Sequence, residues 1–226
     1  SQDRAVTADD YKVLVKSLYA NAQSVQVYGG EDAATPDYGK VYISIKAKSG
    51  SNLTELTKTD LVKSLKSFAV ASVTPVIIDP ETTFITLETT FKYDSSLTTK
   101  DVSTLQTNVL NAVSSYNTST LEDFTGMFRY SEVLKTIDDA DTSILSNITK
   151  VKMYKFITPT LNSALKYTVS YNNAIYNPHS GHNASAGGVV SSTGFKINND
   201  SSTNEHFLDD DGAGNIRAYY LSGTTR

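Results

Sequence analysis

Three histidines and a run of aspartates are the side chains whose types and spacing could do chemistry. His179 and His182 are separated only by a serine and a glycine, and His206 stands shortly before the run Asp209–Asp211. Imidazole nitrogens and carboxylate oxygens are common metal ligands, but a metal site needs partners that hold those ligands in place. The first two histidines lie in a stretch rich in glycine and serine. The pattern favours surface histidines over a metal site.

The aspartate run opens a segment, Asp209–Asn215, that superficially resembles a calcium-binding loop. A calcium loop of the EF-hand type has acidic residues at alternating positions before its glycine and a glutamate six residues after it. The sequence DDDGAGN has neither feature. We therefore predict a β-turn here.

Other catalytic patterns are missing from the sequence. The chain has no cysteine, which removes thiol nucleophiles and cysteine-ligated zinc, and no G-x-S-x-G motif of a nucleophilic serine. The glycine pairs Gly29–Gly30 and Gly187–Gly188 lack the lysine or following helix of a phosphate-binding loop. We predict a protein that is not an enzyme, with no catalytic, cofactor-binding or metal-binding residues and no cofactor.

Charge and hydropathy exclude two further kinds of partner. The formal net charge is -4 and the pI is about 5.4, whereas nucleic-acid binding needs a basic surface. Lys150, Lys152 and Lys155 alternate along one predicted strand, and we interpret them as a solvated face. No apolar run approaches the roughly 18 residues that a membrane helix needs. The sequence thus predicts no nucleic-acid partner and no membrane partner.

A recurring pattern marks where helices should begin. Val6, Thr7, Asp10 and Tyr11 have the spacing of an N-terminal capping box flanked by a hydrophobic staple. The same order of apolar residue, threonine, two residues, aspartate and apolar residue returns from Leu56 and from Leu97, so Thr57 and Thr98 are the further predicted caps. We expect helices over residues 8–20, 58–71 and 99–117.

Apolar and polar residues that alternate along the chain predict strands between these helices. Expected strands cover residues 25–28, 41–48, 75–79, 83–93 and 149–157, with a hairpin turn at Asp79–Glu81 and a short helix capped by Ser131 before the last strand. From Val41 the order is strand, helix, strand, strand, helix, strand. That order predicts an α+β fold: a split βαβ (ferredoxin-like) antiparallel sheet of four strands, with an added N-terminal helix and strand.

The composition changes near Thr158. Beyond it tyrosine, asparagine, serine and glycine dominate, and Phe207–Leu221 reads as a closing hairpin. We expect an α+β domain over residues 1–158 and a small β-rich domain, which can be incomplete, over residues 159–226. The tyrosines of this second region can serve core stacking or a subunit contact. They are Tyr167, Tyr171, Tyr176, Tyr219 and Tyr220.

Three segments carry a resemblance to a known family. The motifs R-A-V-T-x-x-D-Y from Arg4, P-D-Y-G-K-V-Y-I-S-I from Pro36 and M-F-R-Y-S-E-V-L-K-T-I-D-D-A-D from Met127 resemble the J-like baseplate wedge proteins of contractile-tailed, T-even type bacteriophages. The similarity is to the C-terminal portion of those proteins. It implies a structural subunit of the virion's tail baseplate, assembled in the host cytoplasm.

The resemblance also implies partners. A member of this family would self-associate as a homodimer, contact other baseplate wedge proteins, and take part in a ring that rearranges when the tail sheath contracts. A second interpretation is a ligand- or receptor-binding module of a tail or surface protein, in which the tyrosine- and asparagine-rich end contacts a glycan or host surface. The chain begins at Ser1 without a methionine, and we expect either a processed chain or a piece of a longer product.

Overall fold

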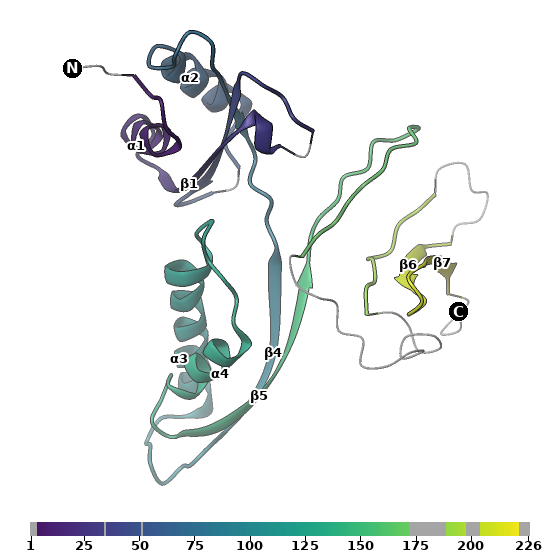
Figure 1. Cartoon of the computed structure of the whole chain (residues 1–226). Coiled ribbons are helices and arrows are strands. Elements are labelled where there is room, and N and C mark those ends of the chain that lie inside the picture. Colours follow the sequence, from purple (N-terminus) through teal and green to yellow (C-terminus); the bar gives the residue numbers. More distant parts are fainter. Residues whose placement is uncertain (1–3, 34, 51, 172–188, 198–203, 222–226) are drawn as a thin grey trace. The chain divides into compact units, whose positions relative to one another are not determined.

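Figure 1 shows the computed structural model, which describes residues 4–33, 35–50, 52–171, 189–197 and 204–221. The chain divides into two compact units, Ser1–Thr158 and Pro159–Arg226. Helices and short sheets alternate through the first unit, so the predicted α+β class is confirmed. In the described part of the chain, no helix combines the length and apolar character that crossing a membrane requires.

The first half of unit one packs two helices on a three-stranded sheet. Its elements are α1 (Ala8–Leu18), β1 (Ala22–Gly29), the 3₁₀ turn η1 (Gly30–Asp32), β2 (Lys40–Ala47), α2 (Glu55–Lys66) and β3 (Thr74–Ile78). The central strand β2 runs antiparallel to β1 and parallel to β3. Ile43 and Ile45 of β2 are buried against Val15 of α1 and Leu61 and Leu65 of α2, in one hydrophobic core.

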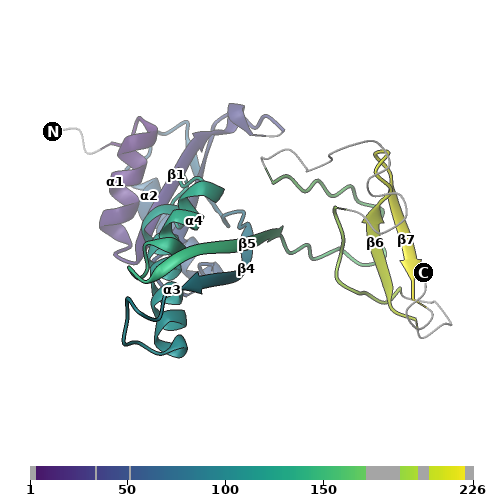
Figure 2. The same ribbon diagram turned by 90° about the horizontal axis from the view of Figure 1, so that it is seen from below.

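The second half of unit one repeats the layout with a smaller sheet. It contains β4 (Phe84–Tyr93), α3 (Val102–Tyr116), the π-helical turn η2 (Asn117–Leu121), α4 (Tyr130–Asp138) and β5 (Ile144–Tyr154). β4 and β5 form an antiparallel pair, and Figures 1 and 2 show both helices on one side of it. The buried members of its core come from both helices and from β5: Val109, Val133, Ile137 and Ile144.

The predicted four-stranded antiparallel sheet is wrong. β3 joins the first sheet beside β2, and β4 joins the second beside β5, so the predicted hairpin at Asp79–Glu81 does not form. The cause is the helix between β2 and β3. A strand that returns through a crossover helix can lie parallel to the strand before it, and this places the apolar Ile77 opposite the buried Ile43.

The first of the three predicted caps is a complete capping box. The Thr7 Oγ1 accepts from the Asp10 backbone N–H at 3.2 Å, and the Asp10 carboxylate accepts from the Thr7 N–H at 2.8 Å. The backbone N–H groups of Thr7 and Val6 lower the pKa of Asp10. The predicted staple is wrong: Tyr11 is buried, but the Val6 side chain is 72% exposed.

The other two predicted caps are wrong by one turn. α2 begins at Glu55 with Thr54 as N-cap, so Thr57 stands inside the helix and donates its backbone N–H to Thr54 Oγ1 at 3.2 Å. α3 begins at Val102, and the cap is Asp101 instead of Thr98.

The short helix α4 also begins before its predicted cap. Its N-cap position is Arg129, so Ser131 lies within the helix. β5 begins at Ile144, five residues ahead of the predicted start at Thr149.

The second unit contains the predicted closing hairpin. β6 (His206–Asp210) and β7 (Ile216–Tyr220) pair antiparallel, with Leu208 opposite Ala218. Two isolated bridges join Ser191 and Phe195 to β6. The alternating residues from Leu165 to Tyr171 form no strand.

Candidate functional site

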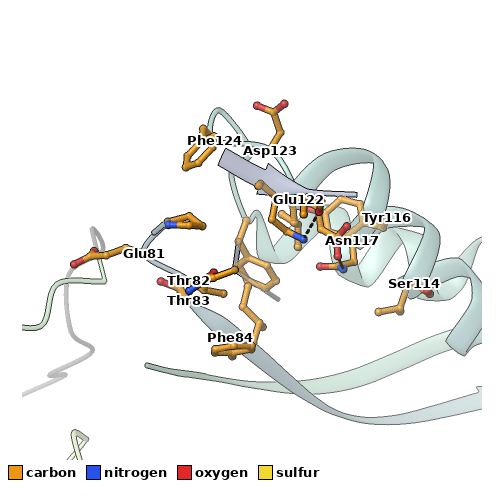
Figure 3. A pocket seen from close by; sticks show the side chains of 18 of the residues that line it. Glu81, Thr82, Thr83, Phe84, Ser114, Tyr116, Asn117, Glu122, Asp123 and Phe124 are labelled. Atoms are coloured by element: carbon orange, nitrogen blue, oxygen red, sulfur yellow. Dashed lines mark hydrogen bonds between the residues drawn. The ribbon is translucent and has the colours of Figure 1, made fainter. Parts of the chain in front are cut away.

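A groove of about 1120 Å³ lies on the surface of unit one. Figure 3 shows its wall: the linker and start of β4 on one side, and the end of α3 with the following turn on the other. β2 contributes residues 45–47. Most of the side chains that line it are apolar, including Ile45, Leu87, Leu110, Val113, Phe124, Phe128 and Phe156.

The polar groups of this groove are engaged in local structure. Glu81 accepts from Lys155 Nζ at 3.0 Å. Glu122 accepts from the Asn117 side-chain amide at 3.0 Å, the bond drawn in Figure 3. Asp123 accepts from the backbone and hydroxyl of the turn residue two positions on, which lowers its pKa. Each of these carboxylates is therefore already engaged by a donor of the chain, and the groove offers an apolar contact surface.

The predicted solvated lysine face is only partly confirmed. Lys150 is exposed, and Lys152 points the same way. The prediction is wrong for Lys155, whose side chain is only 11% exposed because it lies against Glu81.

The structure does not test whether the three histidines lie together. His179 and His182 lie outside them. His206 begins β6, where its ring lies 6.2 Å from the Phe195 ring and 6.0 Å from the Tyr220 ring. Among the residues whose placement the structure gives, no three histidine, aspartate or glutamate side chains gather to hold a metal ion.

The aspartate run closes the β6–β7 turn. Asp209 is buried and pairs with Arg217 through two nitrogens, at 3.1 and 3.2 Å. Asp211 accepts from the backbone of Ala213 and from both nitrogens of Asn215. These bonds, the one from the Asn215 side chain above all, lower the pKa of Asp211 to about 2. The reversal predicted here is thus a five-residue hairpin connection between β6 and β7, closed by the Asp211 N–H to the Asn215 carbonyl, 3.1 Å. The carboxylates of Asp209 and Asp211 are engaged by Arg217 and by the amides of the connection.

One polar cluster was not predicted from the sequence. Asp141, almost buried between α4 and β5, accepts from Lys100 Nζ at 2.5 Å and from the backbone and hydroxyl of Ser143. The Asn108 amide lies 3.4 Å away. The Lys100 ammonium and the Ser143 donors lower the pKa of Asp141. The cluster ties the start of α3 to the turn after α4, across 41 residues of sequence.

The tyrosines of the second unit divide between packing and exposure. Tyr219 stacks on Phe207 at 5.6 Å across the hairpin. Tyr220 is 50% exposed, and Tyr167 is 44% exposed while its hydroxyl accepts from the Thr160 N–H at 2.7 Å. Tyr171 is half-buried, and Tyr176 lies outside the described residues. Tyr219 is therefore packed within the hairpin, whereas Tyr167 and Tyr220 are partly exposed.

Comparison with known proteins matches both halves of unit one to a single family of structural proteins. Residues 7–78 match the model of baseplate structural protein gp6, C-terminal domain I, and residues 81–156 match the model of C-terminal domain III of the same protein. The boundary between the two matches falls in the linker between β3 and β4. Together they define the class: a structural protein of a phage tail baseplate.

A curated relative narrows the class. Baseplate wedge protein gp6 of Enterobacteria phage T4 is 29% identical over 176 residues, which are 77% of this chain and 26% of that protein. The chain thus spans about a quarter of the length of this relative. Residues 7–156 therefore resemble the C-terminal region of a baseplate wedge protein, and the chain is a structural subunit located in the baseplate of the virion.

A solved baseplate also resembles the chain. The anti-feeding prophage baseplate, determined by cryo-EM and 6-fold symmetrised, contains a chain that is 11% identical with a TM-score of 0.46. The likeness covers 69% of this chain and 34% of that one. At that score it supports no conclusion about function.

Proposed function

We propose that this chain associates with itself as a homodimer and with other baseplate wedge proteins, and that it takes part in a ring that rearranges when the tail sheath contracts. The observation that supports this is the match of two consecutive structural domains to the C-terminal region of a wedge protein. The proposal also places the chain in the J-like subgroup and its assembly in the host cytoplasm. It further holds that the chain catalyses no reaction, needs no cofactor, and binds neither nucleic acid nor membrane.

The surface of unit one supports a contact role over a chemical one. The groove of Figure 3 joins apolar side chains from several segments, and its carboxylates are engaged by donors of the chain. Apolar surface of this kind favours protein–protein contact, because burying it removes water at about 25 cal/mol per Å².

The linker between the two matched domains supports the proposed rearrangement. β3 ends at Ile78 and β4 begins at Phe84. Two long hydrogen bonds also join the two halves. The Gln23 side-chain amide donates to the Thr118 carbonyl at 3.5 Å, and the Phe124 N–H donates to Ser24 Oγ at 3.3 Å. Both bonds are weak or long, and small interfaces of this kind permit rigid-body motion.

The division of the chain into two domains is part of the proposal. We infer that residues 159–226 form a β-rich domain of their own, which at that size needs a neighbour for stability. Its apolar residues Leu161 and Leu165 are more than half exposed. That surface also suits the second candidate function, a module that binds a ligand or receptor.

Light scattering on the purified chain tests the self-association. We expect a mass that rises toward a dimer over the micromolar range. A strict monomer at tens of micromolar would contradict the homodimer.

Glycan arrays probed with the same protein test the second candidate function. Saturable binding that is lost in a Tyr220→Ala variant, and kept in a Tyr19→Ala control, would favour the binding module.

A further inference from the structure

The β4–β5 pair leaves one edge of β4 without a strand beside it. Two strands have one shared ladder and two outer edges, and an outer edge presents unpaired N–H and C=O groups. Across the described residues, the backbone bonds of Phe84–Lys92 run to β5 alone. β4 is ten residues long and contains no proline. It is therefore a long edge that no proline interrupts.

Two hydrogen bonds show which backbone groups of β4 point outward. The Asp94 N–H donates to the Ser143 carbonyl at 2.9 Å, which is toward β5. Because direction alternates along a strand, the even-numbered residues of β4 face β5 and the odd-numbered ones face away. In agreement, Thr89 lies opposite Thr149, whose carbonyl accepts from the Tyr130 hydroxyl at 2.8 Å, outside the strand pair. The outward groups belong to Ile85, Leu87, Thr89 and Phe91.

The other outer edge, that of β5, is blocked. The Tyr130 hydroxyl occupies the Thr149 carbonyl there. The register shifts between Lys92 and Tyr93 because β5 has an extra residue, Leu145, and a bulge of this kind disrupts pairing. The exposed charges of β5 within the pair, Lys150 and Lys152, have one sign, so two copies of β5 would repel each other.

The exposed charges of β4 have both signs and select one register for pairing with a second β4. Glu88, Thr90 and Lys92 all point to the face away from the helices. If Thr90 lies opposite Thr90 of an antiparallel copy, each Glu88 lies opposite a Lys92. A shift of the copy by two residues in one direction places Glu88 opposite Thr90, which loses the ion pairs. A shift by four residues in that direction places Glu88 opposite Glu88, and a shift by four in the other direction places Lys92 opposite Lys92. Both of these registers put like charges together.

We propose that β4 pairs antiparallel with β4 of a second copy of this chain, with Thr90 on the two-fold axis. The result is a continuous four-stranded sheet in the order β5, β4, β4, β5. Thr89 and Phe91 exchange backbone hydrogen bonds with Phe91 and Thr89 of the copy, and two Glu88–Lys92 pairs fix the register. This interface rests on the proposed self-association and gives it a location.

Cysteine cross-linking in the full chain tests the register. The chain has no cysteine of its own, so an introduced one has a single possible partner. Opposed residues of a non-hydrogen-bonded pair have Cα atoms about 4.5 Å apart, within the range of a disulfide. Thr90→Cys should therefore form a disulfide-linked dimer in mild oxidant. Thr86→Cys is the matched control on the same strand and face, and its two copies would lie about 26 Å apart in this register.

Charge reversal tests the same contact without a cross-link. Glu88→Lys alone and Lys92→Glu alone should each weaken the dimer about tenfold in sedimentation equilibrium, because each places like charges opposite one another. The double variant should return to the wild-type dissociation constant. Circular dichroism of each variant verifies that the chain is folded.

The outcomes separate this interface from the broader proposal. A dimeric wild type in which Thr90→Cys fails to cross-link, and the reversals change nothing, overturns the β4 interface and leaves self-association standing. A wild type that stays monomeric, with a Thr90→Cys variant that stays unlinked, overturns both.

Discussion

The two halves of unit one solve the same packing problem to different degrees. Each places two helices on one side of a small sheet. In the first half the central strand β2 has neighbours on both sides, and the hydrophobic core holds eleven buried residues. In the second half both strands are edge strands, and the corresponding core holds four. The first half is therefore closer to a self-sufficient domain.

The second half compensates with polar contacts and leaves an edge free. The Lys100–Asp141 cluster joins its two helices and its sheet where apolar contacts are few. A two-stranded sheet is marginal by itself, and three or more strands are usually needed for stability. The difference suggests that the half with the incomplete sheet is the one that uses a partner to complete it.

The largest expected effect is on the first core. Leu65 is fully buried at the contact of α2 with β2, and Leu65→Ala should lower the free energy of unfolding by about 3 kcal/mol. Urea unfolding followed by circular dichroism measures the change. Hydrogen exchange locates it: protection should fall in α1, α2 and β1–β3.

The matched change in the second half is Val133→Ala. Val133 is equally buried but lies in the smaller cluster, and losing two methyl groups should cost about 2 kcal/mol. Its exchange effect should stay in α3, α4 and β5. If either substitution lowers protection evenly across both halves, the two halves unfold as one unit and the comparison fails.

The polar cluster should make the second half sensitive to acid. The pKa of the folded Asp141 carboxyl lies below that of the unfolded chain, near 3.9, so its stabilisation is present above that value. As the pH falls through the unfolded and then the folded pKa, the unfolded state takes up the proton first and the stabilisation disappears. Asp141→Asn should therefore destabilise the protein at pH 7. The difference from wild type should begin to shrink below about pH 4 and disappear only once the pH falls below the folded pKa of Asp141, measured as urea midpoints.

Asp139→Asn is the control for this prediction. Asp139 is two residues away, pairs with Lys135 on the helix surface, and is 61% exposed. Exposed pairs of this type contribute little. A midpoint shift at pH 7 as large as that of Asp141→Asn would mean that general surface charge, and not the buried cluster, sets the acid sensitivity.

Local features of this fold could be read from the sequence, but the pairing of strands could not. The period of apolar residues located α1, α2, α3 and α4 and most strands of unit one, but not the turns η1 and η2. The residues of Asp209–Asn215 predicted the chain reversal between β6 and β7. Strand pairing depends on contacts between distant residues. Nothing in the sequence near Asp79 distinguishes a hairpin from a linker between two sheets, since the deciding contact is Ile77 against Ile43.

The candidate contact surfaces were visible from the sequence only in part. The absence of a catalytic motif and the wedge resemblance pointed to a structural role, and the comparisons bear out that assignment. The groove and the free β4 edge had no sequence signal of their own, because each is made by segments from different halves or by the lack of a neighbouring strand. Lys100 and Asp141 are likewise separated by 41 residues.

The smallest expected effect is at the helix caps, where one sequence pattern has two outcomes. Thr7→Ala removes a true N-cap and should cost about 1 kcal/mol, because a backbone N–H at the start of α1 loses its acceptor. Thr57 holds the equivalent position in the second occurrence of the pattern but lies inside α2. Thr57→Ala should therefore change the free energy of unfolding by no more than about 0.5 kcal/mol. Thermal unfolding of both variants, with Thr54→Ala as the true cap of α2, makes the comparison. Equal losses at Thr7 and Thr57 would mean that α2 begins three residues later in solution than the hydrogen bond from Thr57 to Thr54 indicates.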